Sequence, residues 1–156
     1  MPTTVMQKKI DLYELLRKEG CSRNLAIALL ANIEVETGGT FDHTTKQRGR
    51  ANPAYGLFQF DPIGGLYILY YEYLEEEGVR DSAKAQVEFI VDTLSTQYRK
   101  GVTQVGRGNI NKVMTASRIS PEAGAEAFCT FILRPGKPHL NRRIVAATQI
   151  SKMFNG

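Results

Sequence analysis

Glu36 lies where a helix could hold a carboxyl group away from water. Apolar residues recur at helical spacing just before it, with Leu25, Leu29 and Ile33 on one face. At about 100° per residue, Glu36 lies about 20° from Leu25 and continues this face, whereas Glu34 lies at about 180°, on the opposite side. Two glutamates separated by one residue are therefore expected to have different environments.

A carboxyl group on an apolar face has a distinctive acid–base chemistry. Burial disfavours its charged form and raises its pKa, and the negative end of the helix dipole, just before Gly38, acts in the same direction. Cleavage of a glycosidic bond requires such a protonated acid, because the leaving oxygen must gain a proton as the bond breaks. Alternatively, Glu36 is a frayed C-terminal residue of the helix that reaches solvent. The helix geometry alone leaves both interpretations open.

The segment from Tyr55 to Phe60 is a second group of chemically useful side chains. In an extended chain, Tyr55, Leu57 and Gln59 share one face, and the two phenylalanines share the other. Gly56 allows another chain or a ligand to approach the backbone closely. The carboxamide of Gln59 offers a donor and an acceptor that suit the amide and hydroxyl groups of an N-acetylated sugar. A plain hairpin packed on a core is the alternative.

Together these motifs resemble the lysozyme superfamily. Ala31–Gly39 is similar to the end of the catalytic helix of the phage tail lysozyme domain, and Tyr55–Phe60 is similar to its second motif. Goose-type lysozymes and lytic transglycosylases are further relatives. A later helix also matches, through Ala125–Phe128, Phe131 and Arg134–Gly136. The three motifs occur in the family's order and cover most of the chain.

The resemblance implies a function and a role for several residues. By analogy, Glu36 is the catalytic general acid/base, and Gln59 contacts the substrate together with Tyr55. The substrate would be bacterial peptidoglycan, cut between N-acetylmuramic acid and N-acetylglucosamine without a cofactor or metal. The implied fold is mainly α (α+β lysozyme-like), a helical domain with a short hairpin or loop insert that lines a glycan cleft.

A second carboxylate is the main open question about the reaction. A two-carboxylate glycosidase places the pair roughly 5 to 10 Å apart. Asp42 and Asp61 are nearest in sequence to the motifs, and each could serve there, contact substrate, or simply stabilise a turn. The family commonly has Phe very soon after the helix, whereas Gly39 and Thr40 lengthen that gap here. With Glu36 alone, the resemblance implies a lytic transglycosylase, in which the substrate's own 6-hydroxyl attacks and leaves an anhydro sugar.

The remaining sequence predicts helices around these motifs. We expect one domain over residues 1–156, with helices over 4–19, 22–37, 66–77, 81–98, 123–133 and 140–154 and with loops over 41–62 and 102–109.

The charge distribution limits the choice of partners. The net charge of +4 favours an anionic partner such as the bacterial wall. Lys and Arg are spread along the chain without a basic helix face, so we expect no nucleic-acid partner. No apolar run is long enough for a membrane span, and Met1–Lys9 lacks a signal-peptide pattern. We therefore expect synthesis in a host cytoplasm and action on the wall, as a free endolysin or together with phage tail or virion proteins.

Three further alternatives stay open at this level. The chain could be a non-catalytic virion structural or wall-binding module that keeps the fold. The tyrosines between residues 67 and 73 could pack in the core or stack on sugars. Cys21 and Cys129 match no metal or redox spacing and are either two buried thiols or one long-range disulfide.

Overall fold

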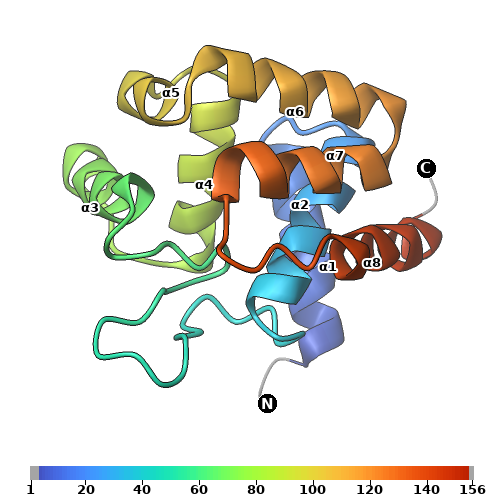
Figure 1. The fold of residues 1–156 in the computed structure, drawn as a ribbon, viewed down its shortest axis with the longest axis horizontal. Coiled ribbons are helices and arrows are strands. Elements are labelled where there is room, and N and C mark those ends of the chain that lie inside the picture. The colour runs from blue at the N-terminus through green and yellow to red at the C-terminus, as the bar shows by residue number, and fades with distance from the viewer. Residues whose placement is uncertain (1–3, 155–156) are drawn as a thin grey trace.

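The computed structural model describes residues 4–154, and helices make up most of them (Figure 1). The expected domain of residues 1–156 includes residues 1–3 and 155–156, which lie outside this range. The α-helices are α1 (Val5–Lys18), α2 (Arg23–Glu36), α3 (Gly65–Glu77), α4 (Ala83–Leu94), α5 (Arg99–Val105), α6 (Arg107–Ile119), α7 (Pro121–Phe128) and α8 (Leu140–Met153). A π-helical segment, η1 (Cys129–Leu133), continues α7. The mainly helical class expected from the sequence is confirmed, and no helix within 4–154 is long and apolar enough to cross a membrane.

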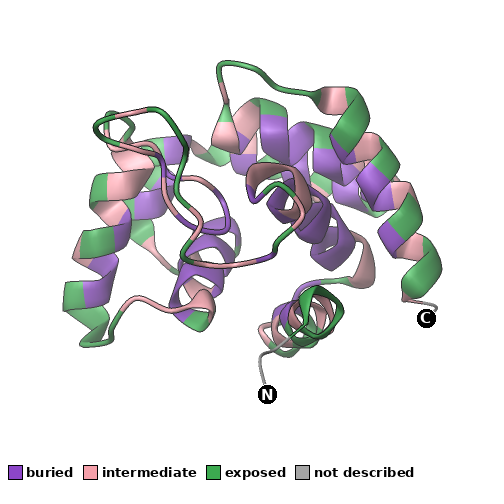
Figure 2. Ribbon diagram, turned by 90° about the horizontal axis from the view of Figure 1, so that it is seen from below, coloured by how far each residue is buried: buried purple, intermediate pink, exposed green. Residues whose placement is uncertain are grey.

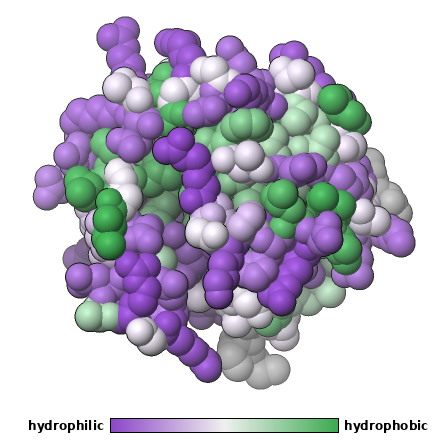
Figure 3. All heavy atoms as spheres, in the orientation of Figure 1, coloured by the Kyte–Doolittle hydropathy of each residue, from purple (hydrophilic) through white to green (hydrophobic). Residues whose placement is uncertain are grey.

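Helix α2 lies at the centre of the bundle, in contact with α1, α6, α7 and α8. Ser22 begins it, because its hydroxyl accepts a hydrogen bond from the Leu25 N–H at 3.1 Å. Every residue from Leu25 to Ile33 is buried, and Figure 2 shows this concentration of buried residues inside the bundle. On the face of the molecule drawn in Figure 3, hydrophilic side chains dominate and apolar ones form separate groups.

Because α2 is packed on all sides, its last residue, Glu36, lies on a rigid support.

Two features of the central region differ from the expectation. The loop expected over 102–109 is instead the end of α5 and the beginning of α6, which meet at Gly106 with a φ of 92°. Gly101 lies within α5, where an added Cβ would overlap the Thr93 side chain of α4. Gly101 therefore serves the close packing of α5 on α4 rather than a loop.

The helix expected to reach Tyr98 ends earlier, at Leu94. Ser82 begins it as the N-cap, because its hydroxyl accepts a hydrogen bond from the Ala85 N–H at 3.0 Å. Beyond its end, Thr96 adopts a left-handed backbone with a φ of 66°, and Tyr98 becomes the residue that precedes α5. This turn allows the Tyr98 ring to pack at 5.1 Å from that of Tyr73, so tertiary contact overrides the helical periodicity.

The segment between α2 and α3 is a long loop with a minimal hairpin. Antiparallel bridges join Tyr55 to Lys46 and to Phe60. The expected extended alternation through residues 55–60 is wrong, because Leu57 and both phenylalanines are buried together. Gln59 has a left-handed backbone with a φ of 50°, and its N–H donates to the Gly56 carbonyl at 3.2 Å. The segment is a tight turn whose apolar side chains enter the core.

Gln86 of α4 anchors this loop from inside the protein. Its fully buried carboxamide accepts from the Leu57 N–H at 2.8 Å and donates to the His43 carbonyl at 3.0 Å. It also donates to Asp81 at 3.0 Å. A Cβ added at Gly56 would lie 2.6 Å from the Gln86 Oε1, so the close approach expected at this glycine is made by a side chain of α4.

The two cysteines are separate buried thiols, and the disulfide alternative is wrong. Cys21 precedes α2, and burial raises the pKa of its thiol to about 12. Cys129 begins η1, and its thiol donates to the Pro138 carbonyl at 3.6 Å. Both residues therefore fill the core as small apolar side chains.

We predict that Gly56→Ala lowers the free energy of unfolding by about 2 kcal/mol or more, because it combines a positive φ of 93° with a collision at Gln86. Urea or thermal unfolding would measure this loss. The matched control is Gly108→Ala, in a helix with open space at the added Cβ, which should be neutral or stabilising by up to about 1 kcal/mol. Equal stability of Gly56→Ala and wild type would contradict this account of the loop anchor.

Candidate functional site

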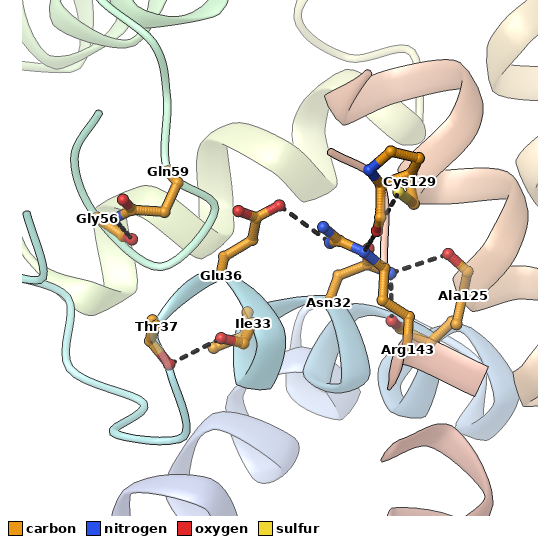
Figure 4. A network of polar contacts seen from close by, with 11 residues as sticks. Asn32, Ile33, Glu36, Thr37, Gly56, Gln59, Ala125, Cys129 and Arg143 are labelled. Carbon is orange, nitrogen blue, oxygen red and sulfur yellow. Dashed lines mark hydrogen bonds and ion pairs between the residues drawn. The ribbon is translucent and has the colours of Figure 1, made fainter. Parts of the chain in front are cut away.

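Glu36 and Glu34 occupy different environments at the end of α2, as the helix geometry predicts. The Glu36 side chain is 14% exposed and points toward Arg143, with Gln59 of the loop on its other side in Figure 4. The Glu34 side chain is 30% exposed, and its carboxylate lies 3.6 Å from the Lys9 ammonium on α1. The frayed, solvent-reaching alternative for Glu36 therefore does not describe this structure.

The turn after Glu36 is held by the next residue in the chain. The Thr37 hydroxyl donates to the Ile33 carbonyl at 2.8 Å and accepts from the Phe41 N–H at 3.0 Å. Thr37 and Phe41 are both buried, and Phe41 is also covered by Lys9, with 5.1 Å between the ammonium and the ring centroid. The polypeptide thus leaves α2 in a defined direction, toward the loop that faces Glu36 in Figure 4.

Arg143 of α8 is the principal partner of Glu36. Its guanidinium Nη1 donates to Glu36 Oε2 at 2.9 Å and to Asn32 Oδ1 at 2.8 Å, while its Nε donates to the Pro138 carbonyl at 2.7 Å (Figure 4). The side chain is only 1% exposed. Asn32 is buried as well and donates to the Ala125 carbonyl of α7 at 3.1 Å. This network joins α2, α7 and α8 around one carboxyl group.

Arg143 is a site residue that the sequence motifs did not predict. A signal was nevertheless present, because Arg143 shares the buried face of α8 with Ala146, Ala147 and Ile150 at helical spacing. An arginine on an apolar helix face requires a buried acceptor. The sequence does not say which acceptor from another helix supplies it.

Burial raises the pKa of the Glu36 carboxyl, while the charge and hydrogen bond of Arg143 act in the opposite direction. The net result is a Glu36 pKa above the usual value for a glutamate. Oε2 is bonded to Arg143, and Oε1 makes no hydrogen bond to any residue within 4–154. One oxygen of a carboxyl group with a raised pKa therefore has no hydrogen-bond partner among the described residues.

Gln59 and Tyr55 lie in the loop, but both are already engaged in hydrogen bonds. Figure 4 shows Gln59 and Gly56 across from Glu36. The Gln59 amide nitrogen donates to the carbonyls of Thr45 at 2.9 Å and Gly56 at 2.8 Å, so its donors hold the turn and its Oε1 remains for other contacts. The Tyr55 hydroxyl donates to Asp81 at 2.5 Å.

Asp81 is a second residue of this region that the sequence did not single out. Its carboxylate accepts from Tyr55, from Gln86 and, at 2.5 Å, from Tyr70. Burial would raise its pKa, but these hydrogen bonds outweigh burial and lower it. Asp81 therefore stays ionised and fixes the loop to α3 and α4.

Asp42 and Asp61 each stabilise a turn. Asp42 accepts from the Thr44 N–H at 2.8 Å and lies 3.5 Å from the Lys8 ammonium. Asp61 accepts from the Ile63 N–H at 2.9 Å and from Arg50 at 3.0 Å. These hydrogen bonds lower the pKa of both carboxyl groups. Neither is bonded to Glu36, and no group of three or more His, Cys, Asp or Glu side chains within 4–154 is arranged to hold a metal ion.

Two cavities lie near these elements. One, of about 540 Å³, lies between the end of α2 and the beginning of α8. The other, of about 730 Å³, lies between the loop and α3 and is lined by Tyr55, Tyr67 and Tyr71. The tyrosines of α3 thus divide into two sets, because Tyr70 and Tyr73 are buried in the core.

No curated protein shows significant similarity to the chain. A family model described as phage tail lysozyme matches residues 7–154, which include Glu36, the loop and Arg143. The name of this family indicates a lysozyme-like glycosidase, in keeping with a helical bundle that holds the largely buried carboxyl group of Glu36 beside a loop. Since the match covers nearly the whole chain, the protein belongs to the phage tail lysozyme family.

Proposed function

We propose that the protein cleaves the glycan strands of bacterial peptidoglycan, with Glu36 as the general acid/base. The observation that carries this proposal is a largely buried carboxyl group, with a raised pKa and one unbonded oxygen, at the end of a rigid helix. Family membership supports the substrate class, the bond between N-acetylmuramic acid and N-acetylglucosamine.

In the first step, protonated Glu36 donates its proton to the glycosidic oxygen as the bond to the anomeric carbon breaks. Burial favours the protonated form before the step, against the influence of Arg143. The carboxylate formed lies 2.9 Å from the Arg143 guanidinium, which stabilises the new negative charge. Because Asn32 and Pro138 already orient this guanidinium, the stabilisation requires little rearrangement.

For the second step we favour attack by the 6-hydroxyl of the muramic acid residue, as in lytic transglycosylases. The hydroxyl oxygen bonds to the anomeric carbon, its proton passes to the Glu36 carboxylate, and an anhydro sugar leaves. This route needs a single carboxylate, in keeping with Asp42 and Asp61, which are held in turns by local partners. In the alternative, two-carboxylate hydrolysis, one of these aspartates would act as the base that activates a water molecule or as the nucleophile that bonds to the anomeric carbon until water replaces it.

The loop residues are proposed substrate contacts rather than catalytic groups. Gln59 Oε1 can accept from the N–H of an acetamido group, and the Tyr55 ring lines the larger cavity. Asp42 and Asp61 are partly exposed at the edges of the same loop, where they can accept from sugar hydroxyls. Tail or virion proteins, or release as a free endolysin, would bring the enzyme to the wall.

The non-catalytic alternative, a virion structural or wall-binding module, explains less of this arrangement. A purely structural domain gains little from a buried ion pair, because replacement by apolar residues is often neutral or stabilising.

We expect Glu36→Gln to reduce release of soluble products from purified peptidoglycan by at least about a hundredfold, because the amide cannot donate a proton to the leaving oxygen. Mass spectrometry of the wild-type digest should show anhydro-muramic ends. The matched control, Glu34→Gln on the opposite face of α2, should keep activity within a few-fold. Full activity in Glu36→Gln would mean that Glu36 is not the acid, and a folded but inactive wild type would favour the non-catalytic module.

Arg143→Met should move the alkaline limb of the pH–activity profile to higher pH. Arg143 lowers the pKa of Glu36, so its removal raises that pKa and keeps the acid protonated further into the alkaline range. Arg142, the exposed neighbour of Arg143, gives the matched control. Arg142→Met removes one positive charge as well, but it should leave the alkaline limb of the pH–activity profile unchanged.

Arg143→Met leaves Glu36 without its cation and is expected to be destabilised by about 3 to 5 kcal/mol, so the profile is measured where circular dichroism shows a folded protein. Arg143→Lys keeps the charge and should give an intermediate profile. An unchanged alkaline limb in folded Arg143→Met would argue against coupling of this pair during the reaction.

Asp42→Asn and Asp61→Asn should each keep activity within about tenfold if Glu36 acts alone, since only local turns are weakened. Initial rates on purified peptidoglycan would measure this. A loss of two or more orders of magnitude in one variant, together with reducing muramic ends in the wild-type digest, would identify that aspartate as the second carboxylate of a hydrolase.

A further inference from the structure

The larger cavity has a lining unlike the rest of the bundle. Its volume is about 730 Å³, and its lining combines three aromatic rings with polar side chains: Tyr55, Tyr67, Tyr71, Thr44, Lys46 and Asn52. Apolar faces with a few polar groups that converge on one space are typical of a ligand site. The acid step at Glu36 makes no use of this space.

The aromatic rings of the cavity are fixed by neighbouring side chains but are not buried in the core. Tyr67 and Tyr71 are four residues apart on α3 and lie on the same face, with ring centroids 5.0 Å apart and planes inclined by 55°. Tyr71 is 40% exposed. The hydroxyl of Tyr55 is held by Asp81 at 2.5 Å. Ring faces held in this way are suited to contact with the apolar face of a sugar.

Lys46 gives the cavity a positive charge without a counter-ion. It is exposed, and within residues 4–154 it forms no ion pair. Lys8 pairs with Asp42 and Arg50 with Asp61, whereas the exposed Arg48 of the same loop is also unpaired among residues 4–154 but does not line the cavity. An unpaired ammonium beside aromatic rings favours a ligand that carries a carboxylate.

We propose that this cavity binds an N-acetylated sugar that carries an acidic peptide, at a position on the glycan away from the bond that is cut. Tyr67 and Tyr71 contact the sugar ring, and Lys46 pairs with a carboxylate of the peptide. This proposal rests on the proposed function, because peptidoglycan supplies sugars with such peptides.

The loop connects the cavity to the proposed acid. It contributes Tyr55 to the cavity, and the next residue, Gly56, lies across from Glu36 in Figure 4. A bound strand can therefore contact both parts of the loop. Binding energy from sugars remote from the reacting bond can then be used to position that bond at Glu36.

Binding is measured separately from cleavage in the Glu36→Gln background, with isothermal titration calorimetry. The two probes are a soluble tetrasaccharide of peptidoglycan with its peptides and the tetramer of N-acetylglucosamine, which has none. Tyr71→Ala should weaken binding of both probes by about tenfold. Lys46→Gln should weaken only the peptide-bearing probe, by about three- to tenfold.

Two control variants match these changes. Ile68→Ala removes an exposed apolar side chain from the same helix outside the cavity lining, and Lys84→Gln removes an exposed charge from α4. Both should bind the probes like the parent. Unchanged affinities in Tyr71→Ala would overturn the proposal, as would an equal effect of Lys46→Gln on both probes.

The results also separate this proposal from the proposed function. If wild type cleaves peptidoglycan while the cavity variants bind normally, the cavity assignment alone fails. If wild type releases nothing but Tyr71→Ala and Lys46→Gln weaken binding as described, the cavity assignment is supported and the protein is a wall-binding module.

Discussion

A guanidinium group in the interior of the bundle connects the elements of the site. Arg143 of α8 donates to the carboxyl group of Glu36, the carboxamide of Asn32 and the carbonyl of Pro138. Burying a guanidinium to 1% exposure is costly without such partners, so α2, α8 and the segment before α8 must meet at this point. The position of the proposed acid and the packing of the bundle thus depend on the same contacts.

The ion pair also bears on the proposed role of Glu36 as both acid and base. Burial without a cation would favour the protonated form of Glu36 and hinder release of its proton. An exposed ion pair would instead favour the ionised form. At Glu36 the two influences oppose each other, and the raised pKa shows that burial prevails. The neighbouring cation then limits the free-energy cost of the carboxylate that forms when the proton leaves.

A second set of buried polar contacts positions the loop. Gln86 bonds to the backbone at His43 and Leu57, and Asp81 holds Tyr55 and Tyr70, so an irregular segment of nearly thirty residues is tied to α3 and α4 at several points. Hydrogen bonds of this kind are directional, and each buried partner would be costly to leave unsatisfied. The loop can therefore present Gly56 and Gln59 opposite Glu36 without a β-sheet to support it.

Local patterns in the sequence determined much of the protein. The caps at Ser22 and Ser82, the apolar stripes of the helices and the place of Glu36 on the inner face of α2 follow from spacing that acts within a few residues, and the structure agrees with them. Contacts between distant residues decided the rest. Gly101 marks close packing on Thr93 instead of a loop, and the tight turn at Gln59 replaces an extended strand because Leu57 and Phe58 enter the core together. The partnership of Glu36 with Arg143 spans 107 positions, and only the tertiary structure could select it, because helical periodicity shows that a side chain is buried but not what it meets.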